Sequence, residues 1–195
     1  MPDRAAHCTE LLLIRHAPVD DGTRLHGRRD VAAVLSPPAA IAAAQRLIGQ
    51  VDRVVSSPAL RCRQTAEALF PDQPTTIDPR LWEQDFGAWE GMRLGELPDI
   101  GPLNRAELAC HAPPDGESFA ALCARCTPAL IELASTGGRV ALIAHAGTIR
   151  AALALAIGSV AAGLAFEIVP LSLTAIRCFG GEDWAIGHVN RLPNH

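Results

Sequence analysis

Short apolar runs of strand length alternate with longer helical segments along most of this chain. Strands are expected at 10–15, 53–56, 75–78, 139–144, 171–178 and 184–189, and helices at 37–48, 60–69, 118–134 and 148–157. Strands that alternate with helices pair in parallel, and the helices then pack on both faces of the sheet. The last two strands are close enough to form a hairpin. The sequence therefore predicts an α/β fold: a three-layer α/β/α sandwich whose central sheet is mixed but mostly parallel.

The length of 195 residues fits one domain, 1–195, with a core large enough to fold alone. A formal net charge of −4 argues against a nucleic-acid or membrane-surface binder. The apolar run 11–14 is too short for a signal peptide, and the apolar segment 151–166 falls short of a membrane span. We therefore expect a cytoplasmic protein that binds neither nucleic acid nor membrane.

All 17 basic residues are arginines, which excludes chemistry that needs a catalytic lysine but leaves phosphate recognition open. The bias toward arginine is also explained by genome composition. The six cysteines are expected to be reduced in the cytoplasm. Cys123 and Cys126 form a C-x-x-C pair inside a predicted helix, with no second pair at zinc spacing, so we expect them to lie on a packed helix face.

Basic and imidazole side chains follow three of the predicted strands at the point where each strand ends. They are Arg15 and His16, then Arg61 in the helix after the second strand, and His145. Because ligands of open α/β sheets bind beyond the carboxyl ends of the strands, we expect these groups to converge. Ser57 is expected to cap the helix that follows the second strand, with Pro58 at its first position. Helix N-termini at this edge would also favour an anion.

Each of these residues alone has an ordinary structural explanation: a lone histidine is most often hydrogen-bonded in the fold, and a lone Arg61 would be solvated. Together they favour an anion site, because burying two imidazoles and two guanidiniums without an anion is costly. No cysteine lies six residues before an arginine, and neither a D-x-D-x-T nor a G-x-S-x-G segment is present. No H-E-x-x-H or H-x-H pair exists, so neither a metal nor a cofactor is expected. Histidine is the nucleophile that remains.

Four segments, in order along the chain, resemble the motifs of the histidine phosphatase superfamily, in its phosphoglycerate-mutase-like branch. They are LIRHA at 13–17, SSPALRCRQTA at 56–66, LWEQDFGAWEG at 81–91 and AHAGTIR at 144–150. The resemblance extends over nearly the whole chain. Within the family, the short chain and the segments DFGAWEG and 116–118 look most like α-ribazole phosphatases.

The resemblance implies a phosphatase that transfers a phosphoryl group to His16 and then to water. It implies that Arg15, Arg61 and His145 hold the phosphoryl oxygens, with Ala146 beside the substrate. Glu83 would protonate the leaving oxygen and then activate water; taken alone, it would be a surface carboxylate in a loop. The segment 83–116, rich in glycine and proline, is expected to be an irregular excursion that walls the active site.

Two positions depart from the family pattern. Ala17 replaces the usual glycine, which is a mild change. Gly22 stands where the family commonly has an asparagine that contacts phosphate, so one hydrogen bond is either missing or supplied elsewhere, with Thr23 and the segment 24–29 as candidates. Arg28 could contact substrate or lie on the surface, and we weigh the two equally.

Two other functions stay open. A mutase-type phosphotransferase is less expected, because 91–116 has only two basic residues, Arg93 and Arg105, against four acids. A catalytically inactive relative that binds a phosphorylated ligand is disfavoured by the intact motif residues. The substrate is expected to be a small-molecule phosphate ester, with α-ribazole phosphate of cobalamin synthesis as one candidate. The apolar segment 164–173 is expected to face the core, with a homodimer interface as the alternative.

Overall fold

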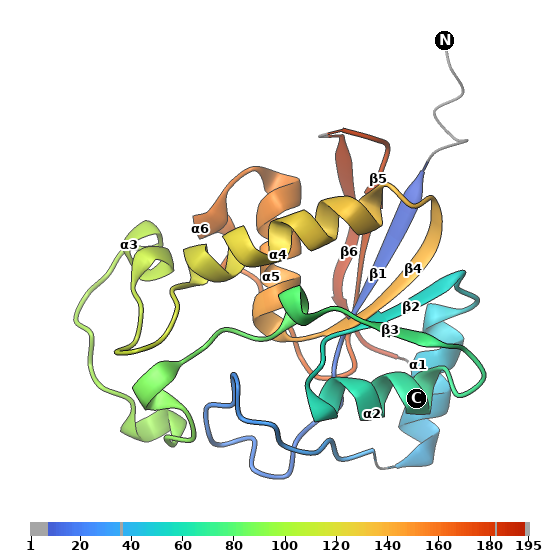
Figure 1. Cartoon of the computed structure of the whole chain (residues 1–195). Coiled ribbons are helices and arrows are strands. Elements are labelled where there is room, and N and C mark those ends of the chain that lie inside the picture. The colour runs from blue at the N-terminus through green and yellow to red at the C-terminus, as the bar shows by residue number, and fades with distance from the viewer. Residues whose placement is uncertain (1–7, 36, 182, 194–195) are drawn as a thin grey trace.

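The computed structural model describes residues 8–35, 37–181 and 183–193. Within these residues, six strands form one central sheet (Figure 1). The strands are β1 (Thr9–Arg15), β2 (Arg53–Ser56), β3 (Thr75–Ile77), β4 (Gly138–Ala144), β5 (Leu173–Cys178) and β6 (Trp184–Arg191). They lie in the order β3-β2-β4-β1-β5-β6. The pairs among β1 to β4 are parallel, whereas β5 is antiparallel to both β1 and β6. This confirms the mixed, mostly parallel sheet.

Helices pack on both faces of this sheet and complete the predicted α/β/α sandwich (Figure 1). One face carries α1 (Pro38–Ile48) and α2 (Leu60–Leu69), and the other carries α4 (Phe119–Ala134) and α5 (Ala146–Ile157). Two short helices, α3 (Arg105–Cys110) and α6 (Val160–Gly163), lie beside α4 and α5. Each predicted strand and helix is present, with ends that differ by two residues or fewer.

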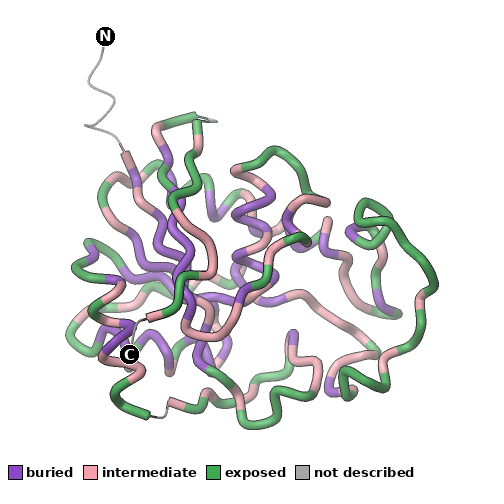
Figure 2. The backbone as a smooth tube through the Cα atoms, turned by 180° about the vertical axis from the view of Figure 1, so that it is seen from behind, coloured by how far each residue is buried: buried purple, intermediate pink, exposed green. Residues whose placement is uncertain are grey.

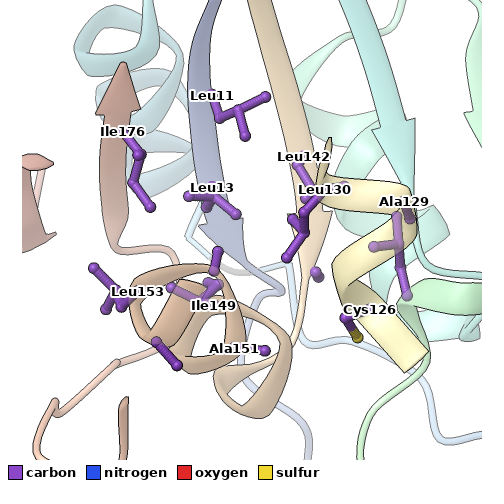
Figure 3. Close-up of a cluster of buried hydrophobic side chains, with 14 of the residues drawn as sticks. Leu11, Leu13, Cys126, Ala129, Leu130, Leu142, Ile149, Ala151, Leu153 and Ile176 are labelled. Carbon is purple, nitrogen blue, oxygen red and sulfur yellow. The ribbon is translucent and has the colours of Figure 1, made fainter. Parts of the chain in front are cut away.

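The core consists of two apolar layers, one on each side of the sheet. The buried stretches of the chain gather in the middle of the molecule (Figure 2). Successive residues of a strand point to opposite faces, so a strand buried on both sides is apolar throughout. Leu11 and Leu13 of β1 therefore join the layer under α4 and α5 (Figure 3), and Leu12 and Ile14 join the layer under α1 and α2. Cys126, in α4, is fully buried in the first layer, as expected for a packed helix face.

β1 lies at the centre of the sheet, but both of its neighbours come from the distant C-terminal part of the chain. Leu12 of β1 is in register with Ala141 of β4 on one side and Ala175 of β5 on the other. The backbone N–H of His16 continues this ladder, because it donates to the carbonyl of Ala144 at 2.9 Å. The carboxyl ends of β1 and β4 are thereby held side by side.

The start of α2 differs from the prediction. The helix begins at Leu60 and its N-cap is Ala59, without a side-chain hydrogen bond. The cap expected at Ser57 is wrong because the Ser57 hydroxyl is hydrogen-bonded to Nε2 of His145, at 2.8 Å. Ser57 thus bonds to His145, the residue that follows β4, and does not cap α2.

The segment 83–116 is more regular than expected. It contains the 3-10 turns η2 (Gly87–Trp89) and η3 (Leu94–Glu96) and the helix α3, and it follows the turn η1 (Pro79–Leu81). Its two ends are tied together, because Ala88 N–H donates to the carbonyl of Pro114 at 2.9 Å. Gly87 is required at this crossing: its φ is +50°, and a Cβ there would lie 2.1 Å from the Pro114 oxygen.

No helix in the described parts of the chain is long and apolar enough to cross a membrane. The cytoplasmic location stays a prediction.

Candidate active site

The carboxyl ends of β1, β2 and β4 bring the predicted histidines and arginines together. The rings of His16 and His145 meet edge to face, with centroids 5.3 Å apart. Arg61, from the first turn of α2, lies between them and donates to both rings. His16 and Arg61 line a cavity of about 250 Å³, whereas His145 is fully buried and contacts both of them from outside the lining. Its lining includes Arg15, His16, Arg61, Glu83 and Ala146 from the predicted set, together with Gly22, Arg24, Leu25, Phe86, Phe119, Arg150 and Leu164.

The hydrogen bonds of His16 fix the position of its proton. Nδ1 lies 2.7 Å from the carbonyl oxygen of Ala17, which can only accept, so Nδ1 carries the hydrogen. Nε of Arg61, which can only donate, lies 3.3 Å from Nε2 of His16. Burial, followed by the positive charge of Arg61, lowers the pKa of His16 to about 3. The ring is therefore neutral at physiological pH, with the lone pair of Nε2 directed toward the guanidinium.

His145 is fully buried, and both of its nitrogens have partners. Nη2 of Arg61 donates to Nδ1 at 3.2 Å, so Nε2 carries the hydrogen and donates to Oγ of Ser57 at 2.8 Å. Burial, and then the charge of Arg61, lowers the pKa of His145 well below its usual value. The ring of Trp82 lies parallel to it, with centroids 6.4 Å apart. Because a hydroxyl both donates and accepts, Ser57 can also accommodate the other tautomer of His145.

Both core arginines are anchored by backbone carbonyls and not by carboxylates. Arg61 is 1% exposed, and its Nη1 and Nη2 donate to the carbonyls of Arg29 and Gly27 at 2.9 and 2.8 Å. Arg15 donates from Nη1 to the carbonyl of Ile168 at 2.6 Å, while its buried Nε has no partner within the described structure. Burial lowers the pKa of Arg15. Carbonyls orient these guanidiniums without neutralising them, so the site keeps a positive charge for an anion.

Glu83 lies at the N-terminus of α5 and lines the same cavity as the arginines. Its carboxylate accepts from the backbone N–H groups of Gln84, at 2.9 Å, and Gly147, at 3.2 Å. The approach to the helix requires a glycine, because a Cβ at Gly147 would lie 2.1 Å from Oε1 of Glu83. A carboxylate is thereby held at a helix N-terminus beside the histidines, with access to the cavity.

Residues 11–191 match the model of branch 1 of the histidine phosphatase superfamily. The chain belongs to this superfamily. A glucosyl-3-phosphoglycerate phosphatase of Mycolicibacterium vanbaalenii is 34% identical over 166 residues, which make up 76% of this chain and 74% of that relative. A bifunctional protein of Mycobacterium tuberculosis is 38% identical over 130 residues; the match takes in 57% of this chain but spans only a third of that protein (33%).

Solved structures of histidine phosphatase relatives share the whole fold. The native structure of a mycobacterial glucosyl-3-phosphoglycerate phosphatase superposes with a TM-score of 0.81 at 27% identity, over 94% of this chain and 99% of the other. A structure described as mycobacterial hydrolase 2 gives a TM-score of 0.84 at 26% identity, over 97% of this chain and 93% of the other. The resemblance predicted from the four motifs is confirmed at the level of the superfamily.

Three predicted substrate contacts of this histidine phosphatase, His145, Thr23 and Arg28, lie outside the cavity lining. His145 is fully buried and contacts the lining residue Arg61. The hydroxyl of Thr23 is exposed and donates to Oδ1 of Asp21 at 2.6 Å. The guanidinium of Arg28 lies over the ring of Trp82, 5.5 Å from its centroid, and its Nη2 is 3.8 Å from a carboxylate oxygen of Glu117. The side chains of Thr23 and Arg28 are therefore engaged with the protein itself.

Arg150 is the charged residue of the lining that the sequence analysis did not single out. It closes the motif AHAGTIR and lies four positions after Ala146 and three after Gly147, so α5 places it on the same helix face as these two lining residues. The helical spacing was the signal that could have revealed it. No group of three or more metal-ligating side chains is found among the described residues.

Proposed function

We propose that this protein is a phosphoric monoester hydrolase that works through a phosphohistidine on His16. The observation that carries the proposal is the state of His16: a neutral, buried ring whose Nε2 lone pair faces an unneutralised arginine. A nucleophile of this kind needs no activating base, because its proton is already on the other nitrogen. The family membership supports the same chemistry.

In the first step, Nε2 of His16 attacks phosphorus and the bond from phosphorus to the ester oxygen breaks. Arg15, Arg61 and His145 hold the three equatorial oxygens, whose negative charge spreads in the transition state. For this, the hydrogen bond from Arg61 Nη2 to Nδ1 of His145 breaks as Arg61 turns to the phosphate, the neutral ring carries its hydrogen on Nδ1, and Nε2 accepts from the Ser57 hydroxyl. Glu83, in its protonated form, gives its proton to the departing oxygen.

In the second step, Glu83 takes a proton from water, the oxygen of that water attacks phosphorus, and the bond to Nε2 breaks. Inorganic phosphate is released and His16 regains its starting state. Hydrolysis is favoured over transfer to a second acceptor because Arg93 and Arg105, the basic residues of 91–116, are exposed and absent from the cavity lining. An inactive ligand-binding relative is disfavoured because His16, Arg61 and Glu83 meet at one cavity.

The substrate is a small-molecule phosphate monoester. The motif resemblance favours α-ribazole phosphate, whereas the similarity to glucosyl-3-phosphoglycerate phosphatases favours a phosphoglycerate derivative. The two leaving groups differ in charge: the glycerate part of a phosphoglycerate derivative carries a carboxylate, and α-ribazole carries none.

The test uses Glu83→Gln, which keeps the size of the side chain but cannot transfer a proton. With p-nitrophenyl phosphate, whose leaving group needs little help, the variant should release one equivalent of nitrophenolate and then stall. With an alkyl phosphate, the first turnover should slow by about 10²–10⁴-fold, the usual contribution of a general acid. Acid quench during the burst should leave acid-labile, base-stable phosphate on His16.

His16→Ala is the control and should give no burst with either ester. Activity of the unmodified protein should survive exhaustive chelation of divalent metals. Equal slowing of both esters by Glu83→Gln would assign the acid to another residue, Asp85 or Glu90. Label on His145, or a label stable to acid, would overturn the proposed function.

A further inference from the structure

The cavity contains more positive charge than one phosphate requires. Four arginines line it, Arg15, Arg24, Arg61 and Arg150, against the single carboxylate of Glu83. Arg24 is neutralised locally, since its Nε lies 2.6 Å from the carboxylate of Asp21 and its Nη1 donates to the carbonyl of Gly91. Arg15 and Arg61 belong to the phosphoryl site proposed above. Arg150 is the charge that remains without an assigned partner.

The guanidinium of Arg150 is hydrogen-bonded to the protein along one edge, and its other edge, unpaired among the described residues, is free to bind a ligand. Its Nε donates to the carbonyl of Phe166 at 2.8 Å, which fixes the plane of the guanidinium. Nη1 and Nη2 have no hydrogen bond or ion pair within the described parts of the chain. The side chain is half-buried and lines the same cavity as His16. Two parallel N–H donors on a fixed plane match the two oxygens of a carboxylate.

The surroundings of Arg150 strengthen this preference. Phe119 and Leu164 line the same cavity. Gly163 brings Phe119 close to the helix of Arg150: a Cβ at Gly163 would lie 2.6 Å from the carbonyl of Arg150 and 3.2 Å from the Phe119 ring. Apolar walls reduce screening by water, so an anion bound there interacts more strongly with the guanidinium. The positive charge of Arg150 also contributes to the lowered pKa of Arg15, which places the two guanidiniums within electrostatic reach.

We propose that Arg150 binds a carboxylate on the leaving group, so that the substrate class is that of small phosphate esters that also carry a carboxylate. The proposal rests on the proposed function, because it takes Arg15 and Arg61 as the phosphate ligands. A carboxylate fits better than a second phosphate, since one guanidinium would leave most of a second phosphate's charge unpaired. Among the two candidate substrates, this favours a phosphoglycerate derivative over α-ribazole phosphate.

The test compares two esters that differ in one group. 3-Phosphoglycerate and sn-glycerol 3-phosphate share a three-carbon phosphate ester, and the carboxylate of the first is a hydroxymethyl group in the second. Dissociation constants are measured by calorimetry on His16→Ala, which leaves both esters intact. The carboxylated ester should bind about 10–100-fold more tightly, the worth of a charge-assisted hydrogen-bonded pair.

Adding Arg150→Gln to His16→Ala should bring the two dissociation constants within about twofold of each other, as expected when the charged pair is gone. Arg63→Gln, which removes an exposed arginine of α2 outside the cavity, is the matched control and should keep the full preference. If Arg150→Gln fails to fold after losing its bond to Phe166, the comparison on His16→Ala alone still decides whether the cavity selects a carboxylate, which the proposal requires. Equal binding of the two esters, or no measurable binding of either, overturns the proposal.

Different results would overturn the proposed function and the proposed role of Arg150. A phosphohistidine burst with p-nitrophenyl phosphate, together with equal binding of the two esters, would overturn only the role of Arg150. A strong preference for the carboxylated ester, without any phosphohistidine, would overturn only the proposed function.

Discussion

The position of one hydrogen atom decides whether His16 can act as a nucleophile, and its neighbours fix that position. The acceptor for Nδ1–H is the backbone carbonyl of Ala17, which any residue would supply. This explains why the departure from glycine at position 17 is mild. The backbone N–H of Ala17 donates to Oγ1 of Thr65 at 2.9 Å, so the carbonyl is held in place from the other side.

Gly22 offers a direct test of the missing phosphate contact. It lines the cavity, and among the described residues a Cβ there would meet only the carbonyl of Val19, at 3.9 Å, so a larger side chain has room. Gly22→Asn should tighten inhibition by inorganic phosphate by about 2–10-fold, the worth of one hydrogen bond of about 0.5–1.5 kcal/mol. The inhibition constant is measured against p-nitrophenyl phosphate.

Gly95→Asn is the matched control, because Gly95 is exposed, has no neighbour within 4 Å of a built Cβ, and lies outside the cavity. It should leave phosphate inhibition unchanged. Unchanged or weaker inhibition in Gly22→Asn would mean that another group already holds the phosphate oxygen in question.

Among the site residues, the sequence predicts the positions of those that follow directly from the order of the strands and helices. His16 and His145 directly follow strands, so their convergence could be predicted from the order of the elements. The contacts of Thr23 and Arg28 depend on how a loop folds against Asp21 and Trp82, which no periodicity encodes. Arg150 sits on a predictable helix, but the partner that fixes its plane, the carbonyl of Phe166, comes from a distant turn.

Glu90 connects two loops and, through them, orients Arg61. Its carboxylate accepts from the backbone N–H groups of Gly27 at 3.1 Å and Arg28 at 2.7 Å, and from Phe86 at 3.2 Å. The same loop presents the carbonyls that anchor Arg61. The two segments approach so closely that a Cβ at Gly27 would lie 2.4 Å from Oε1 of Glu90. Glu90 is therefore a positioning residue for Arg61.

Glu90→Gln should lower kcat/KM for p-nitrophenyl phosphate by about 10–100-fold, because an amide cannot accept all of these bonds and charge-assisted bonds are worth about 1.5–3 kcal/mol. In an Arg61→Ala background, the same substitution should have little further effect, since the side chain it positions is gone. Glu96→Gln, at an exposed position of η3, is the control. Equal losses with and without Arg61 would show that Glu90 serves stability alone.

The strands and helices with apolar periodicity were predictable as elements, and the capping details were not. Helix α3 is six residues long and buries only Ala109, so it has no apolar stripe to reveal it. Its capping box, in which Asn104 and Glu107 bond to each other's backbone, was the available signal. Ser57 precedes a helix and has the composition of a cap, but tertiary contact with His145 outweighs that local preference.

The stability of the whole molecule should depend on pH through its buried neutral histidines. His16 and His145 have lowered pKa values in the folded state, so below about pH 6.5 the unfolded chain binds more protons than the folded one. The free energy of unfolding should therefore be highest at pH 7.5 and fall by about 2 kcal/mol through His16 by pH 5, with a further loss in the same direction through His145. Urea unfolding at several pH values measures this loss.

Replacing His16 or His145 with glutamine should each remove part of the loss, whereas His111→Gln, at a half-buried position outside the cavity, is the control. A stability that does not vary between pH 7.5 and pH 5 would mean that the two rings are protonated in the folded protein. The two apolar layers share one sheet, which supports the proposal of a single domain, so one cooperative transition is expected in these experiments.

The central place of β1 has a consequence for how the protein is made. Ribosomes release β1 early, but both strands that flank it, β4 and β5, are complete only at Ala144 and Cys178. At about 5–20 residues per second, the apolar strand waits roughly 10–30 s of synthesis for its partners. During that time, its backbone and its leucines are exposed to other chains and to chaperones. The centre of the finished sheet thus closes late, just before β6 pairs at the edge, and His16, at the end of β1, is positioned only when β5 has emerged.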